Sequence, residues 1–129
     1  MGVSYPVDMK VTFNFSNRLA LIEIKWLGSS IKPNGKLVSH FDSRARSGAK
    51  QLADYLVKNR KQAPTHITRG YLVVFDGRRR RIKKHPKSID NEDGGHYRHR
   101  EIKFDPKYDE ELDDFETPIR MFMEPIIEP

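Results

Sequence analysis

The chain has 129 residues, of which 33% are charged and 36% hydrophobic, with a formal net charge of +6 and no cysteine. This length suits one domain with a single core. The sequence has no apolar run long enough to cross a membrane and no signal-peptide pattern, which predicts no membrane partner. The lack of cysteine excludes disulfides and thiolate metal sites and fits a cytoplasmic protein.

The charge is unevenly distributed along the chain. Residues 1–77 carry 12 Lys/Arg and 5 Asp/Glu (+7), residues 78–103 carry 10 and 4 (+6), and residues 104–129 carry 2 and 9 (−7). A basic body with an acidic tail favours a polyanionic partner, nucleic acid first, over a merely soluble surface.

Two strands are expected near the N-terminus. Residues 5–15 alternate between apolar and polar side chains, the period of a half-buried strand. Residues 19–27, LALIEIKWL, form an apolar run interrupted only by Glu23 and Lys25. Ser16-Asn17 between them is suited to a two-residue turn, which predicts an antiparallel hairpin.

This turn sets the expected register. Pairing Phe15 with Arg18 places Lys10 opposite Glu23 and Asp8 opposite Lys25. Asp8, Glu23 and Lys25 then share one face of the hairpin. The other face is expected to pack on the core, through Met9, Val11, Phe13, Ala20, Ile22 and Ile24.

An Asp, a Glu and a Lys on one sheet face suit divalent-metal phosphodiester chemistry. Carboxylate oxygens are ligands that Mg²⁺ accepts while it keeps positions for water and phosphate. A neighbouring ammonium can orient the attacking water or offset the developing charge. A quiet structural ion pair is the alternative for Glu23 and Lys25.

The middle of the chain predicts a loop and a helix. Residues 28–42 contain Pro33-Asn34-Gly35 and are expected to form a loop, where Lys32 and Lys36 could reach phosphate. Residues 43–61 show helical apolar periodicity, with basic residues in the last turn. Gln51 and Tyr55, four residues apart, lie on one face of this helix.

The second half combines one apolar strand with strongly charged segments. Residues 69–76 are expected to form a strand, 98–104 a polar strand, 109–116 a helical turn or an acidic linker, and 118–127 a terminal strand. The basic run 78–87 predicts either an arm that binds phosphate or a solvated loop. In residues 96–100, HYRHR, a tyrosine lies among basic side chains and could stack on a nucleotide. The candidate nucleic-acid contacts are Lys10, Lys32, Lys36, Arg78, Arg79, Arg80, Arg81, Lys83, Lys84, Tyr97 and Arg98.

Two motifs resemble the PD-(D/E)XK nuclease superfamily, whose fold is restriction-endonuclease-like. Pro6-Val7-Asp8 is followed after fourteen residues by Glu23-Ile24-Lys25, although the family places Pro directly before the Asp. Gln51-Leu-Ala-Asp-Tyr55 is similar to the QxxxY motif of RecB-type nucleases. The resemblance covers about residues 5–77, and the usual leading helix and first strand have no counterpart.

The resemblance implies an α/β fold with a mixed β-sheet and a flanking helix. It also implies that Asp8 and Glu23 bind Mg²⁺ or Mn²⁺, that Lys25 positions water, and that Gln51 and Tyr55 organise the substrate side. We expect a metal-dependent nuclease that hydrolyses DNA, with a nuclease-like domain over 1–104, a basic insertion at 78–100 and an acidic extension over 105–129.

Two alternatives remain at this stage. One is a nucleic-acid-binding module that does not cut, and the other is an interaction domain of a larger ATPase or defence protein. A homo-oligomer, or an N-terminal domain on a longer chain, could complete the sheet.

Overall fold

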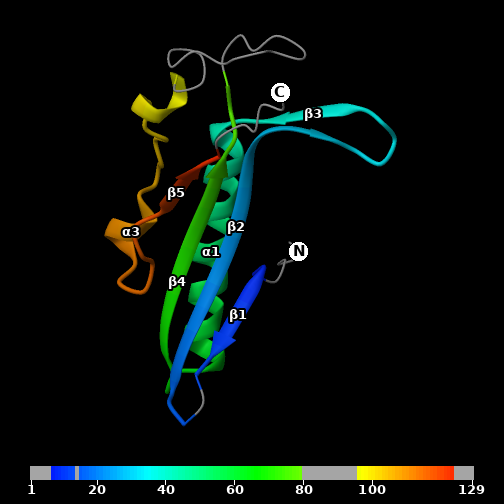
Figure 1. Ribbon diagram of the computed structural model, residues 1–129. Helices are drawn as coiled ribbons and strands as arrows, with labels where there is room; N and C mark the ends of the chain where they lie inside the picture. The colour runs from blue at the N-terminus through cyan, green and yellow to red at the C-terminus, as the bar shows by residue number, and fades with distance from the viewer. Residues whose placement is uncertain (1–6, 14, 80–95, 124–129) are drawn as a thin grey trace.

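The computed structural model describes residues 7–13, 15–79 and 96–123, which form an α/β fold with one long helix against a mixed sheet (Figure 1). The elements are β1 (Met9–Thr12), β2 (Arg18–Ile31), β3 (Leu37–His40), α1 (Asp42–Gln62), β4 (Ile67–Asp76), the 3₁₀ helix η1 (His96–His99), α3 (Tyr108–Glu111) and β5 (Ile119–Phe122). No helix within these ranges is long and apolar enough to span a membrane.

The five-stranded sheet is built around the long strand β2. Its order is β1-β2-β4-β5, with β1 antiparallel to β2 and with β4 parallel to both β2 and β5. β3 pairs with the far end of β2, so this hairpin extends beyond the body of the sheet (Figure 1). α1 makes the crossover between the parallel strands β2 and β4, as such a connection requires.

The core lies between α1 and one face of the sheet. Alternate residues of β2 and β4 are buried, as expected for strands covered on that side. Gly70 allows close packing, because a Cβ there would lie 2.7 Å from Leu56 Cδ1 of α1. The buried apolar residues are Leu19, Leu21, Leu27, Ala45, Ala49, Leu52, Ala53, Leu56, Leu72, Val74 and Phe115.

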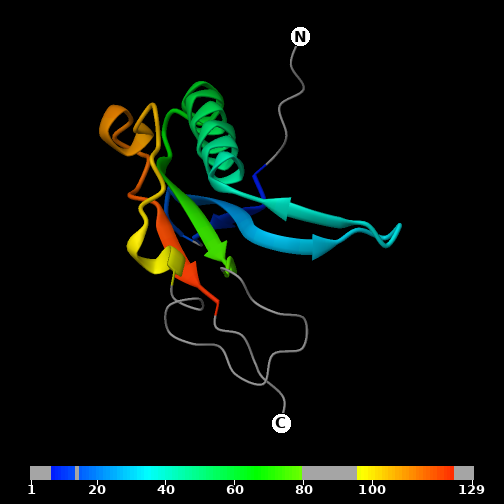
Figure 2. The same cartoon turned by 90° about the horizontal axis from the view of Figure 1, so that it is seen from above.

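The opposite face of the sheet, here called the open face, carries no helix among the described residues. α1 lies behind the sheet in Figure 1 and on one side of it in Figure 2. The strand register assigns to the open face Met9 and Val11 of β1, Arg18, Ala20, Ile22, Ile24 and Trp26 of β2, Ile67, Arg69, Tyr71, Val73 and Phe75 of β4, and Ile119 and Met121 of β5.

The prediction of which sheet face packs on the core is therefore wrong. α1 covers the face that carries Glu23 and Lys25, whereas Met9 and Phe13 are 47% and 51% exposed. Both faces of β2 are apolar enough to be buried, and the two charges favoured the incorrect choice. The position of α1 decides between the faces, and strand alternation alone does not contain it.

The hairpin register also differs from the expected one, by two residues. Lys10 lies opposite Leu21, and Met9 lies opposite Ile22, which places Asp8 beside Glu23 rather than Lys25. The reversal is longer than two residues, because the Phe13 N–H bonds to the Arg18 carbonyl at 3.4 Å. A shift of two preserves the side on which each residue lies, so Asp8 and Glu23 still share a face.

Two further expectations need correction. Residues 28–42 are not a plain loop, because β2 continues to Ile31 and pairs with β3. Residues 98–104 do not form a strand, and η1 occupies the start of that segment. The helix expected at 43–61 is confirmed as α1, and the strand expected at 69–76 is confirmed as β4. β5 lies within the strand expected at 118–127, of which residues 124–127 are outside the described ranges.

Candidate functional site

Three of the five predicted catalytic residues, Asp8, Glu23 and Lys25, meet on the helix-covered side of β1 and β2. Lys25 Nζ lies 3.1 Å from Glu23 Oε1. Asp8 Oδ2 accepts a hydrogen bond of 2.7 Å from the backbone N–H of Ile24, just past the last ladder pair of β1. This bond holds the Asp8 carboxylate at the backbone of Ile24, the residue between Glu23 and Lys25.

The Glu23–Lys25 pair is almost enclosed. The Glu23 side chain is 4% exposed and that of Lys25 is 9% exposed. Burial raises the pKa of Glu23 above its ordinary value of 4.5; the hydrogen bond and charge of Lys25 oppose this, and the negative charge of Asp8 adds to it. The site thus holds two carboxylates under like-charge repulsion beside one ammonium.

Gly48 of α1 makes room for Lys25. A Cβ at this position would lie 2.6 Å from Lys25 Cγ and 3.0 Å from Leu72 Cδ1. The aliphatic stem of Lys25 therefore passes directly against the helix backbone, and its ammonium is directed back to Glu23. A side chain larger than hydrogen at residue 48 would displace it.

Gln51 and Tyr55 lie on the side of α1 that is turned toward β1. The other side of the helix faces the C-terminal segment, because Arg60 pairs with Asp114 and Arg46 donates to the Lys103 carbonyl. Helical periodicity places Gln51 and Tyr55 across the buried stripe from those two arginines. Both are half-buried, and Gln51 lies about one turn beyond Gly48, which itself packs against Lys25.

The donor set fits a magnesium or manganese ion. Mg²⁺ is commonly bound through one or two carboxylates, with water and phosphate oxygens completing its shell. Asp8 and Glu23 supply two such carboxylates on one face. Burial is the main cause of the raised pKa of Glu23, and the negative charge of Asp8 adds a smaller repulsion that a cation would relieve. Within the described ranges, no group of three or more His, Cys, Asp or Glu residues gathers as a larger metal site.

The candidate nucleic-acid contacts occupy different environments. Lys10 on β1 and Lys32 and Lys36 on the β2–β3 hairpin are exposed. The two hairpin lysines flank a tight turn in which the Lys32 N–H bonds to the Lys36 carbonyl at 2.9 Å. Four further candidates, Arg80, Arg81, Lys83 and Lys84, lie outside the described residues.

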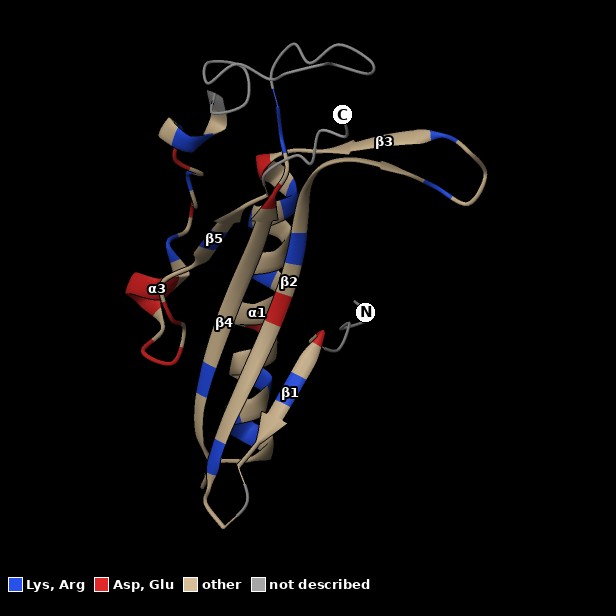
Figure 3. Cartoon of the chain, in the orientation of Figure 1, with Lys and Arg blue, Asp and Glu red and all other residues tan. Residues whose placement is uncertain are grey.

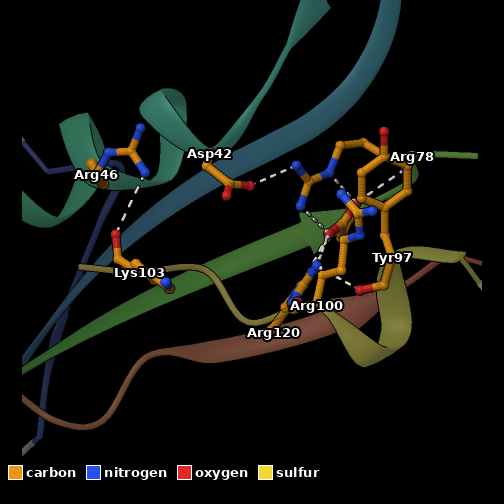
Figure 4. Close-up of polar contacts among 8 residues, drawn as sticks. Asp42, Arg46, Arg78, Tyr97, Arg100, Lys103 and Arg120 are labelled. Atoms are coloured by element: carbon orange, nitrogen blue, oxygen red, sulfur yellow. Dashed lines mark hydrogen bonds and ion pairs between the residues drawn. The ribbon is translucent and has the colours of Figure 1, made fainter.

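Arg78 is a structural residue at the end of β4 (Figure 4). Its Nη2 and Nε bond to the two oxygens of the fully buried Asp76 at 2.9 and 3.0 Å, and its Nη1 bonds to Asp42 of α1 at 2.6 Å. Arg120 of β5 adds a bond of 2.6 Å to Asp76. Burial alone raises the pKa of Asp76, but the bonds from Arg78 and Arg120 outweigh it and lower that pKa below 3.8. The Arg78 guanidinium is thus occupied within the protein.

Sequence reasoning missed this network, here called the Asp76 network: Asp42, Asp76, Arg78 and Arg120. The available signal was an Asp that ends an apolar strand with an Arg two residues later, which places both on the same side. The partner on β5 carries no local signal.

The remaining aromatic and basic candidates lie beside the Asp76 network. The Tyr97 ring stacks under the Arg78 guanidinium at 4.4 Å, and Arg98 lies 5.8 Å from the Phe122 ring. Arg79 donates to the Arg78 carbonyl, and burial together with the charge of Arg98 lowers its pKa. A cavity of about 300 Å³ adjoins Tyr97 and is lined also by Arg46 and Arg100.

Comparisons with known proteins identify no relative of this chain. No family model matches the chain, and neither the curated proteins nor the solved structures contain a significant match.

Proposed function

We propose that the protein is a metal-dependent nuclease of the PD-(D/E)XK type, acting on DNA phosphodiester bonds. The observation that carries this proposal is the meeting of Asp8, Glu23 and Lys25 on one face, beneath a helix that turns Gln51 and Tyr55 toward the same strands. The strand order around β2 is compatible with a restriction-endonuclease-like core.

Each residue has a distinct role in this proposal. Asp8 and Glu23 hold the cation, which supplies Lewis acidity and a more acidic bound water. Lys25 holds a positive charge beside the phosphate and orients the attacking water. Gln51 and Tyr55 donate hydrogen bonds to the substrate, and the enclosure around Glu23 keeps bulk water away from the reacting group.

The test is cleavage of linear, circular and single-stranded DNA with Mg²⁺ or Mn²⁺. Wild-type protein should cut at least one of these substrates, and Glu23→Ala and Lys25→Ala should abolish cutting. Asp54→Ala and Lys50→Ala are matched controls, because both residues are exposed on α1 and should leave cutting unchanged.

DNA binding without metal separates the two catalytic variants. Glu23→Ala removes a negative charge near the phosphate, so affinity should hold or rise. Lys25→Ala should weaken binding slightly. Equal loss of binding in both variants would contradict the assigned roles.

A nucleic-acid-binding module that does not cut is the second candidate, and the burial of the Glu23–Lys25 pair favours it. If the pair is only structural, Glu23→Ala leaves a buried ammonium uncompensated and costs about 3–5 kcal/mol of the free energy of unfolding. A loss of that size, together with a wild-type chain that cuts no substrate with either metal, would replace the nuclease by the binding module.

A further inference from the structure

The open face is the largest feature of the fold that the proposed catalytic site does not explain. Its side chains are hydrophobic except Arg69 and Arg18, the latter at the first residue of β2. None of them is buried, although the residues that alternate with them on β2 from Leu19 to Leu27 are all buried beneath α1. Parallel strands normally have both faces covered, and the continuous apolar run Tyr71–Phe75 of β4 is typical of such strands.

The exposed apolar area of the open face is at the upper end of the range for the largest apolar patch of a monomer. Met9, Trp26, Ile119 and Met121 are 47%, 37%, 44% and 49% exposed. If a large side chain has an area of roughly 150–250 Å², these four expose on the order of 300–400 Å², and the half-buried members bring the face to on the order of 600 Å². The largest apolar patch of a typical monomer is about 300–600 Å². A stable interface buries about 800 Å² on each partner.

We propose that the open face binds the open face of a second copy of this chain. The area is close to what each partner of a stable dimer contributes. The described residues place two charged side chains on the face. Arg69 already lies 3.4 Å from Glu116 and donates to the Asp113 carbonyl at 2.7 Å, and Arg18 is the first residue of β2, at the end of the sheet. The middle of the face, from Ala20 to Trp26 on β2 and from Tyr71 to Phe75 on β4, therefore carries no charged side chain where two copies would meet.

The geometry of the sheet permits this contact. Two twisted sheets pack face to face about 10 Å apart with their strands inclined by about 30°. A two-fold axis through the interface makes one patch complementary to itself. α1 and the Glu23–Lys25 pair then lie on the outer sides of the dimer, away from the contact.

Trp26, the one tryptophan of the chain, is a built-in probe of this interface. Acrylamide quenching of its fluorescence should fall as protein concentration rises, in parallel with a doubling of the mass measured by light scattering. An unchanged quenching constant and a monomeric mass from below 1 μM to about 100 μM would overturn the proposal. A dimer whose Trp26 stays equally quenchable would also overturn it, because such a dimer uses another surface, such as the free edge of β1.

Substitutions on the two sides of the molecule provide the matched comparison. The double variant Ile119→Lys/Met121→Lys should raise the dimer dissociation constant at least tenfold. Val57→Lys, on the exposed side of α1 where Val57 is 42% exposed, should leave it unchanged. Equal effects of the two changes would contradict the proposal. If the double variant loses its folded circular dichroism spectrum, the quenching measurement on the wild-type chain still decides.

Discussion

At the scale of single residues, the contact between Gly48 and Lys25 positions the candidate site. Glycine weakens a helix interior, so its presence in the second turn of α1 needs a local reason. That reason is the stem of Lys25, which occupies the space of the missing Cβ. A residue outside the motif therefore controls where the motif's ammonium lies.

Gly48→Ala should move Lys25 and impair cleavage without removing any charge. Overpacking costs about 1–3 kcal/mol, and the better helix propensity of Ala returns about 1 kcal/mol. We expect a net loss of about 0–2 kcal/mol in urea unfolding and a loss of activity larger than this stability change explains. Ser47→Ala, at the neighbouring exposed position, should alter neither, and equal behaviour of the two variants would contradict the role of Gly48.

The raised pKa of Glu23 predicts a specific pH dependence of stability. Because the folded chain binds this proton more tightly than the unfolded chain, the carboxyl stabilises the fold below its unfolded pKa, near 4.5. That contribution is lost as the pH rises through the higher folded pKa. Wild-type stability minus that of Glu23→Gln should thus increase as the pH falls from 7 toward 4.5. A difference that stays flat in denaturant titrations over this range would count against a raised pKa.

At the scale of elements, the β2–β3 hairpin is the exposed basic feature nearest the carboxyl end of β2. It carries Lys32 and Lys36 around a turn in which Gly35 adopts a φ of 81°, a region that favours glycine. Because ligands bind at the carboxyl ends of parallel strands in α/β sheets, this position suits a contact with the substrate backbone.

Lys32→Ala/Lys36→Ala should weaken duplex binding irrespective of sequence. Each lost phosphate contact lowers the salt slope of the binding constant by about 0.9, so the double variant should lose up to about 1.8. Lys50→Ala/Lys107→Ala removes the same charge from α1 and the acidic segment. Fluorescence anisotropy at several salt concentrations compares the two, and an equal reduction in slope would show that only net charge matters.

The sequence predicts α1, β4 and the charged pair of β2 well, because apolar periodicity and motif spacing are local properties. The hairpin register differs from the predicted one because the chain reversal contains more residues than Ser16-Asn17. This longer reversal depends on the backbone at Phe15, whose φ is 63°. The pairing of β2 with β3 was missed because Pro33-Asn34-Gly35 signals only the turn. The face covered by α1 and the bond from Arg120 to Asp76 depend on contacts distant in sequence, which no local pattern encodes.

At the scale of the whole molecule, the C-terminal segment is part of the domain. Phe115 is buried in the core and forms an isolated bridge with Gly70, and β5 pairs with β4. Figure 3 shows that the acidic residues around α3 lie at the β4–β5 side of the sheet, and Asp114 of this segment pairs with Arg60 of α1. The acidic tail thus neutralises part of the basic helix and joins it to the sheet.

Asp76→Asn should be among the most destabilising polar substitutions in the chain. It leaves Arg78 and Arg120 without their common carboxylate, and breaking a buried ion pair costs about 3–5 kcal/mol. Because the pKa of Asp76 is lowered, its contribution is present above pH 3.8 and is lost as the pH falls through its folded value. Thermal unfolding at neutral pH compares Asp76→Asn with Asp113→Asn, an exposed control in the C-terminal acidic segment. Similar melting temperatures of the two variants would contradict the role of the Asp76 network.

The separation between Asp76 and Arg120 has a consequence for synthesis on the ribosome. The carboxylate is made 44 residues before the Arg120 side chain that completes its bonding. At roughly 5–20 residues per second, this delay lasts about 2–9 s. When Asp76 is added, β2, α1 and β4 are already synthesised, while Phe115 and β5 are still to come. The nascent chain therefore exposes the β4 edge and a gap in the core, which is the state that a chaperone acting during translation would meet.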